Sequence, residues 1–169
     1  MGVAIAIERA DFADPELPLL LQAHLDDLAP TAPPESRHAL DLTGLQSPAV
    51  RLWVGRDRGR IVATGALAGL APGHEELKAM RTDPARRREG IARVVLDHLL
   101  HDAAGRGVDR VSLETGSMAF FDPARRMYAG AGFVTCRPFG SYVEDPNSVF
   151  MTRRIRRPVS AVAPMPASG

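Results

Sequence analysis

The order of the expected elements predicts an α/β (α+β) fold in a single domain. Short runs of branched apolar residues, typical of strands, are interleaved with stretches whose apolar residues recur at helical spacing. Strands that are mixed with helices in this way form a sheet covered by helices. The length of 169 residues fits one domain with its own core, because 45% of the residues are hydrophobic and 24% are charged.

The first part of the chain is expected to form a strand, two helices and then a two-stranded hairpin, in that order along the sequence. Residues 3–7 are apolar and form a short strand. Residues 15–28 place leucines along one side of a helix, and the prolines that follow end it. Residues 36–45 are predicted to form a second short helix. Residues 50–56 and 61–70 are strands, and the short polar turn between them predicts a hairpin.

The clearest helix of the chain spans residues 91–104. Ile91, Val95 and Leu99 recur every four residues and form the centre of an apolar face, which is typical of a helix packed on a sheet. Glycines after residue 104 end the helix. Further strands are predicted at residues 77–82, 108–115, 133–137 and 148–155, with one more helix at residues 123–131.

Composition and charge narrow the classes of function and the location. Lys plus Arg is 21 and Asp plus Glu is 20, so the net charge is +1 and neither nucleic acid nor a membrane is expected as a partner. The single cysteine, Cys136, cannot form an internal disulfide, and we recognise no signal peptide or spanning segment; the expected location is cytoplasmic. The histidines lack ligand spacing, so no metal is expected, and His24 is expected to pack on an apolar helix face. Residues 1–157 are predicted to form the domain and residues 158–169 a flexible tail.

The most informative stretch is an arginine-rich turn between a strand and the helix that begins after Gly90. The first N–H groups of a helix lack partners and carry partial positive charge, which together attract phosphate. Gly90 lets a ligand approach the backbone closely, and Arg86, Arg87 and Arg88 add positive charge. A solvated basic loop is the alternative, but the position between a strand and a strong amphipathic helix favours phosphate binding. No P-loop and no dinucleotide motif is present.

Two motifs in this order carry a resemblance to a known family. Arg87, Gly90 and Ala92 match the first, and the segment from Tyr128 to Phe133 matches the second. The chain therefore resembles the GCN5-related N-acetyltransferase (GNAT) superfamily from residue 3 to residue 156, and within it a poorly characterised bacterial subgroup. The resemblance implies a central mixed, twisted sheet of roughly six or seven strands with helices on both faces. It also implies a splayed parallel strand pair that holds acetyl-CoA.

The resemblance further implies an N-acetyltransferase that uses acetyl-CoA as donor. The acceptor would be a primary amine of a small molecule or amino acid, which attacks directly in a ternary complex. The alternatives are a protein lysine or N-terminal acetyltransferase and a non-catalytic acyl-CoA-binding module. Family members often dimerise, so a homodimer is allowed. The expected cofactor-binding residues are Met80, Arg81, Thr82, Arg87, Arg88, Glu89, Gly90, Ile91, Ala92, Arg93, Ser117 and Tyr128.

Three residues are candidates for catalysis. Tyr128 matches the family's usual general acid for the thiolate, although a tyrosine there could also simply pack in the core. Glu76, at the start of the strand facing the acetyl group, is either the general base through water or a solvated charge. The backbone N–H of Met80 is expected to meet the acetyl oxygen. Phe121 stands where many members carry an asparagine that contacts the cofactor, and Ser117 or Asp122 could replace that contact.

The acceptor pocket is expected between two loops, residues 31–41 and 137–147. Glu144 or Asp145 could hold an ammonium group, and Arg37 or Arg137 could hold a carboxylate, which would suit an amino-acid-like acceptor. Taken singly, each of these residues is better explained as a loop charge in water. The substrate-binding candidates are Arg37, His38, Tyr142 and Glu144.

Overall fold

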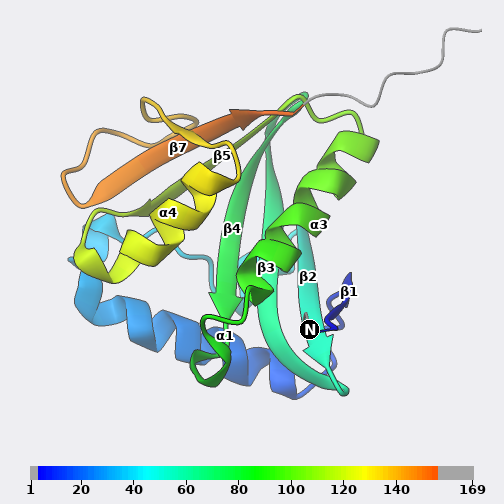
Figure 1. Ribbon diagram of the computed structural model, residues 1–169. Helices are drawn as coiled ribbons and strands as arrows, with labels where there is room; N and C mark the ends of the chain where they lie inside the picture. The colour runs from blue at the N-terminus through cyan, green and yellow to red at the C-terminus, as the bar shows by residue number, and fades with distance from the viewer. Residues whose placement is uncertain (1–3, 156–169) are drawn as a thin grey trace, which may run out of the picture.

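The computed structural model describes residues 4–155 and shows a single mixed sheet (Figure 1). The sheet has seven strands in the order β1-β2-β3-β4-β5-β7-β6. All neighbours are antiparallel except β4 and β5, which are parallel. This confirms the predicted fold class. The strands are β1 (Ala6–Arg9), β2 (Val50–Asp57), β3 (Arg60–Ala71), β4 (His74–Thr82), β5 (Arg110–Gly116), β6 (Val134–Thr135) and β7 (Ser148–Arg154).

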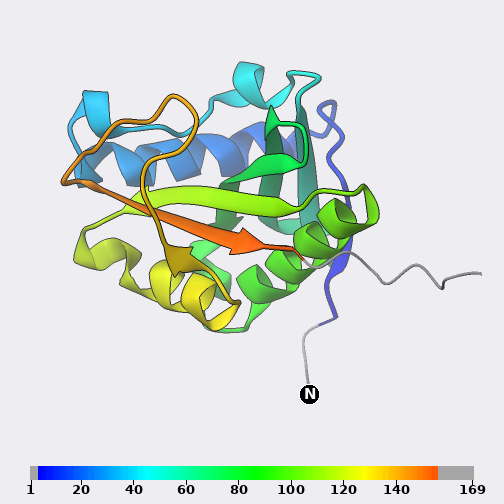
Figure 2. The same ribbon diagram turned by 90° about the horizontal axis from the view of Figure 1, so that it is seen from above.

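Helices cover both faces of the sheet, as Figure 2 shows from above. On one face α3 and α4 pack on a core of leucines and valines that includes Leu67, Val95 and Leu99, all fully buried. On the other face α1 packs on a smaller core around Leu17, Leu45 and Leu52. None of the helices within residues 4–155 is long and apolar enough to cross a bilayer. The helices are α1 (Glu16–Leu28), α2 (Leu42–Leu45), α3 (Ile91–Gly105) and α4 (Asp122–Gly130), with short 3-10 turns at Ala29–Thr31, Pro34–Ser36, Pro84–Arg86 and Ala119–Phe121.

The prediction of one helix over residues 36–45 is wrong. The segment instead runs as a 3-10 turn, an extended stretch and the short α2. Tertiary contacts hold it open, because the Lys78 ammonium donates to the His38 carbonyl and Ser36 donates to Asp145. The strand predicted at residues 133–137 is reduced to β6, and the strand predicted at residues 77–82 begins earlier, at His74. The tail predicted at residues 158–169 lies outside the described residues.

The parallel pair β4 and β5 separates partway along its length. The two strands pair only where His74–Leu77 faces Arg110–Leu113. Beyond that point β4 continues beside β3 to Thr82, and β5 continues beside β7 to Gly116. A bulge bends β4 at Ala79, which has a φ of 52°, and the Thr64 hydroxyl donates to the Ala79 carbonyl at 2.7 Å. The predicted splay is thus present, and it opens a cleft between the ends of the two strands.

Candidate active site

The cleft between the splayed strands has two arms that meet in the middle of the molecule. The wide arm, about 540 Å3, runs along β4 to the start of α3 and is bordered by α4. The narrow arm, about 160 Å3, runs the other way, between the ends of β4 and β5 and the segment that follows α1. The residues that line both arms form the junction: His24, Leu28, Met80, Phe121, Ala124 and Tyr128.

The wide arm ends at the N-terminus of α3. Gly90 is the N-cap with a φ of 79°, a left-handed conformation that favours glycine, and no side chain caps the helix. A Cβ built on Gly90 would meet nothing within 4 Å, so the space in front of the first turn is open. The N–H groups of Ile91, Ala92 and Arg93 have no partner inside the helix. This end of the arm is therefore suited to an anion.

The arginines of the turn have different roles. Arg86 binds Asp57 at 2.9 Å and Glu89 at 2.7 Å, which raises the pKa of its guanidinium and fixes the shape of the turn. Arg87 and Arg88 are exposed, line the wide arm and make no ion pair within residues 4–155. They are free to pair with an anion in front of α3.

Of the other residues predicted to hold a cofactor, some line the wide arm and some do not. Arg81 and Thr82 line the wide arm, but the Arg81 guanidinium turns away to pair with Asp27 on α1. Glu89 is bound to Arg86 and does not line the arm. The Ser117 hydroxyl donates to the Pro146 carbonyl at 2.7 Å, and Ser117 lines neither arm.

Phe121 fills the position between the two arms where the family pattern led us to expect an asparagine. A Cβ on Gly116 would lie 2.2 Å from two carbons of the Phe121 ring, so the ring packs directly on the end of β5. Asp122 forms ion pairs with Arg125 and Arg126. Neither Asp122 nor Ser117 lines either arm, and the surface presented to the cleft here is aromatic.

Tyr128 is the one buried hydroxyl group at the junction. It extends from α4, lines both arms and is 6% exposed. Its ring packs against Phe133 with centroids 5.9 Å apart, so it belongs to the core as well as to the site. Burial raises the pKa of the hydroxyl, which makes no hydrogen bond within the described residues. A neutral tyrosine with a spare O–H faces the point where the arms meet.

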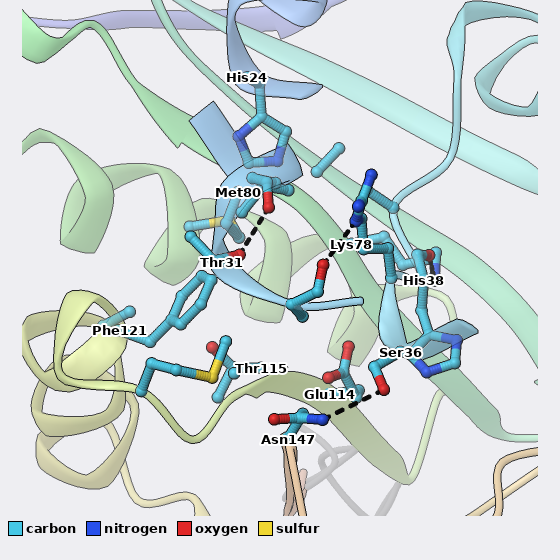
Figure 3. Close-up of a pocket in the computed structure, with 18 of the residues that line it drawn as sticks. His24, Thr31, Ser36, His38, Lys78, Met80, Glu114, Thr115, Phe121 and Asn147 are labelled. Carbon is cyan, nitrogen blue, oxygen red and sulfur yellow. Dashed lines mark hydrogen bonds between the residues drawn. The ribbon is translucent and has the colours of Figure 1, made fainter. Parts of the chain in front are cut away.

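His24, which was expected to pack on an apolar helix face, also lies at the junction. Figure 3 shows its ring hanging from α1 beside Met80. Burial, reinforced by the charge of Arg81, lowers the pKa of His24 to about 4, so the imidazole is neutral at physiological pH. Its buried Nδ1 has no hydrogen-bond partner among the described residues. The sequence signal for this position was only a histidine on an apolar helix face.

The narrow arm contains a closed network around Glu76. Glu76 Oε2 accepts from Lys78 Nζ at 3.1 Å and from the Tyr142 hydroxyl at 2.5 Å. Lys78 Nζ also donates to the Tyr142 hydroxyl and to the His38 carbonyl, each at 3.1 Å. Burial and the Glu76 carboxylate raise the pKa of Tyr142. Tyr142 lies behind the wall of the arm, whereas Glu76, Lys78 and His38 line it.

Glu114 is a lining residue that the prediction of the site missed. It follows Leu113 on β5, and Figure 3 shows it with Thr115 and Asn147 along the side of the narrow arm opposite His24 and Lys78. Burial raises the pKa of its carboxyl group. The available signal was an acidic residue inside the strand predicted at residues 108–115.

The remaining acceptor candidates lie at the rim or outside. Arg37 is exposed at the rim of the narrow arm and donates through Nε to the Ala32 carbonyl at 2.8 Å. Asp145 accepts from the Ser36 hydroxyl at 2.6 Å, which ties its loop to the segment after α1 and uses one of its oxygens. Glu144 and Arg137 are exposed or half-exposed and line neither arm.

Comparison with known proteins agrees with this geometry. The family model described as the Acetyltransferase (GNAT) family matches residues 17–133. The uncharacterised N-acetyltransferase YsnE of Bacillus subtilis is 46% identical over 136 residues, 80% of this chain and 90% of that protein. The IAA acetyltransferase of Azospirillum brasilense is 36% identical over 135 residues, which are 79% of this chain and 84% of that protein. A Klebsiella pneumoniae structure classed among acyl-CoA N-acyltransferases matches with a TM-score of 0.75 and 29% identity, covering 90% of this chain and 98% of its own.

Proposed function

The chain belongs to the GNAT family of acetyltransferases, and from that premise we propose that it transfers an acetyl group from acetyl-CoA to a primary amine of a small molecule. The wide arm would take the donor and the narrow arm the acceptor, so that the two substrates meet at Tyr128 and Met80. Direct attack within this ternary complex uses proximity as a main source of rate.

The observation that carries the proposal is the uncapped start of α3 beside the splayed strands. Open space in front of Gly90 fits the pyrophosphate, because the N–H groups of the first turn and the free Arg87 and Arg88 side chains can bind it. The backbones of Met80 and Thr82, on the edge of β4 that β5 leaves uncovered, would hold the pantetheine arm. The wide arm has the volume of an ordinary ligand site.

Acetyl-CoA would supply an activated thioester, and the residues at the junction would stabilise the charges that develop in the transfer. The bulge at Ala79 displaces β4 from its ladder just before Met80, whose N–H we propose as the donor to the acetyl oxygen. Tyr128 would donate its proton to the departing sulfur. Because burial raises the pKa of Tyr128, the hydroxyl stays protonated throughout the physiological range and is always able to donate.

The narrow arm favours a small acceptor. At about 160 Å3 it is smaller than most sites for drug-sized ligands. Two carboxylates line it: Glu76 is already paired with Lys78, whereas Glu114 suits an ammonium group. Arg37 at the rim suits an acceptor that also carries a carboxylate. The name of the Azospirillum relative, an IAA acetyltransferase, is consistent with a small-molecule acceptor.

The proposal is tested by thiol release from acetyl-CoA in the presence of a panel of small primary amines. The panel pairs amino acids with the amines that lack their carboxylate, together with a lysine-containing peptide. We expect turnover of small amines above the rate without acceptor. Turnover of the peptide alone would replace this proposal by protein acetylation, and no turnover of any amine would contradict it.

A further inference from the structure

Glu76, the expected general base, already accepts hydrogen bonds from other residues of the protein. Its Oε2 accepts from both Lys78 Nζ and the Tyr142 hydroxyl. The Glu76 and Lys78 side chains are 8% and 11% exposed, so the pair is buried. Protonating Glu76 would leave the Lys78 ammonium without its counter-ion in a site of low dielectric, which is unfavourable. Glu76 is therefore poorly placed to take a proton from a substrate.

Glu114 occupies the first position of β5 beyond the last residue that pairs with β4. Leu113 pairs with Leu77, and past this rung the strands diverge, so no β4 residue lies opposite Glu114. In the antiparallel ladder with β7, Glu114 faces Phe150, whose ring contacts Phe139 and Tyr142. The side chain thus projects beside an aromatic cluster into the opening that forms the narrow arm.

We propose that Glu114, and not Glu76, holds the acceptor's ammonium group in the narrow arm and removes its proton; this assignment rests on the function proposed above. The site would therefore select small primary amines that enter as cations. Glu76, Lys78 and Tyr142 would act as the rigid wall against which the amine is positioned.

The electrostatic surroundings of Glu114 fit this role. Burial raises the pKa of the carboxyl group, and the Glu76 carboxylate on β4 adds to the effect. His38, from the segment after α1, and Lys78, on β4, act in the opposite direction, as does Ser148 on β7. A carboxylate with a raised pKa is a stronger base than one in water, and its charge in a desolvated arm attracts an ammonium ion.

Protons and electrons balance in this step with Glu114 of the narrow arm, Tyr128 of the junction and solvent. The ammonium passes one proton to Glu114 and becomes a neutral amine, while Glu114 becomes a neutral carboxylic acid. The nitrogen lone pair then forms a bond to the acetyl carbon as the carbon–sulfur bond breaks. Tyr128 supplies a proton to the sulfur, and the second proton of the nitrogen restores Tyr128 through solvent. Glu114 returns its proton to water at the open end of the narrow arm.

The test compares Glu114→Gln with Glu76→Gln, which remove the same charge on facing strands, and with Glu144→Gln, an exposed residue outside both arms. Thiol release is measured from pH 6 to 9.5 with the amine of the panel that the wild type uses fastest. Thermal shift with acetyl-CoA shows whether each variant still binds the donor. Glu114→Ala with added formate provides a second route, because a small carboxylate can replace the missing base.

We expect Glu114→Gln to lower kcat/KM about 100-fold at pH 7 while donor binding is retained, with activity recovering as pH rises and more free amine is present. Formate should partly rescue Glu114→Ala. Glu76→Gln should keep the pH profile of the wild type. An unchanged rate in Glu114→Gln would overturn the assignment of Glu114 as the base. Loss of the acidic limb of the pH–rate profile in Glu76→Gln instead would do the same. Either result would leave the proposed function standing. A wild type that binds acetyl-CoA but acetylates no amine would overturn the proposed function itself.

Discussion

The two arms of the cleft are built in different ways. The wide arm depends on backbone geometry within one stretch of chain: the part of β4 that β5 leaves uncovered, the left-handed Gly90 and the uncapped start of α3. The narrow arm depends on side chains such as His38, Lys78 and Glu114, which come from distant parts of the sequence. A short motif can specify the first kind of site, whereas only the completed fold assembles the second. Donor binding and acceptor chemistry should therefore respond to different substitutions.

The largest effect is expected from Gly90→Glu in the wide arm. A side chain at this left-handed position is strained, and a carboxylate there would repel the phosphates that the helix start attracts. Affinity for acetyl-CoA, measured by calorimetry, should fall at least ~1,000-fold, since charge repulsion adds to the loss of the helix-terminal site.

Gly59→Glu is the matched control for that variant. Gly59 has a φ of 80°, a Cβ added there would also meet nothing within 4 Å, and the residue lies in the β2–β3 turn and lines neither arm. The variant carries the same backbone strain and the same added charge. Donor affinity should be unchanged in Gly59→Glu, and an equal loss in both variants would mean that strain, and not the phosphate site, was responsible.

Removing Lys78 should have the next largest effect, on the narrow arm and on stability. Lys78→Met removes the ammonium group that neutralises the buried Glu76 carboxylate and that also donates to the Tyr142 hydroxyl. The free energy of unfolding should fall by about 3 kcal/mol, and Lys78→Met combined with Glu76→Gln should recover part of it. Arg93→Met, which breaks an exposed pair with Asp97, should cost no more than about 0.5 kcal/mol in the same denaturant titration. Equal losses would show that the Glu76 network is not a buried ion pair.

Tyr128→Phe tests the junction between the arms. Because the Tyr128 hydroxyl makes no hydrogen bond within the described part of the protein, its removal should leave both folding and acetyl-CoA affinity intact. The turnover number should fall about 100-fold, the usual contribution of a general acid. An undiminished kcat would restrict Tyr128 to packing against Phe133.

His24 gives the smallest expected effect, a dependence of stability on pH. The folded protein keeps His24 neutral down to about pH 4, whereas the unfolded chain takes up a proton below about pH 6.5. Stability from this site is complete above pH 6.5 and is lost as pH falls toward 4, by about 2 kcal/mol when partial exposure is allowed for. His24→Gln cannot titrate, so its urea unfolding free energy should fall less over this range. Parallel curves for the two proteins would contradict the lowered pKa.

The same contrast explains what could be predicted from the sequence. The fold class was predicted from periodicity and the turn at Gly90 from a local motif, whereas the splayed strands were implied by the family resemblance. Glu114 was missed because its position depends on the register between β4 and β5, which the sequence does not reveal. The helix expected at residues 36–45 failed for a related reason: contacts with Lys78 and Asp145, remote in sequence, hold that segment extended.

The placement of His24 and Ser117 depended on tertiary contacts in the same way. His24 lies on α1, and the ion pair between Asp27 of α1 and Arg81 of β4 joins that helix to the strand that borders the cleft. Ser117, expected to reach the cofactor, is instead bound to the loop that carries Pro146. In each case the residue type was informative, but its partner could not be identified from local sequence.

The measurement that tests the central claim most directly is a thermal-shift titration of the protein with acetyl-CoA, with ATP and NADH as controls. A ligand at about a hundred times its dissociation constant stabilises the folded state by roughly 2.7 kcal/mol, which raises the Tm of a domain of this size by several degrees. We predict such a rise with acetyl-CoA and a much smaller one with either control. No rise with acetyl-CoA, or equal rises with all of these ligands, would contradict the assignment of the wide arm as the donor site.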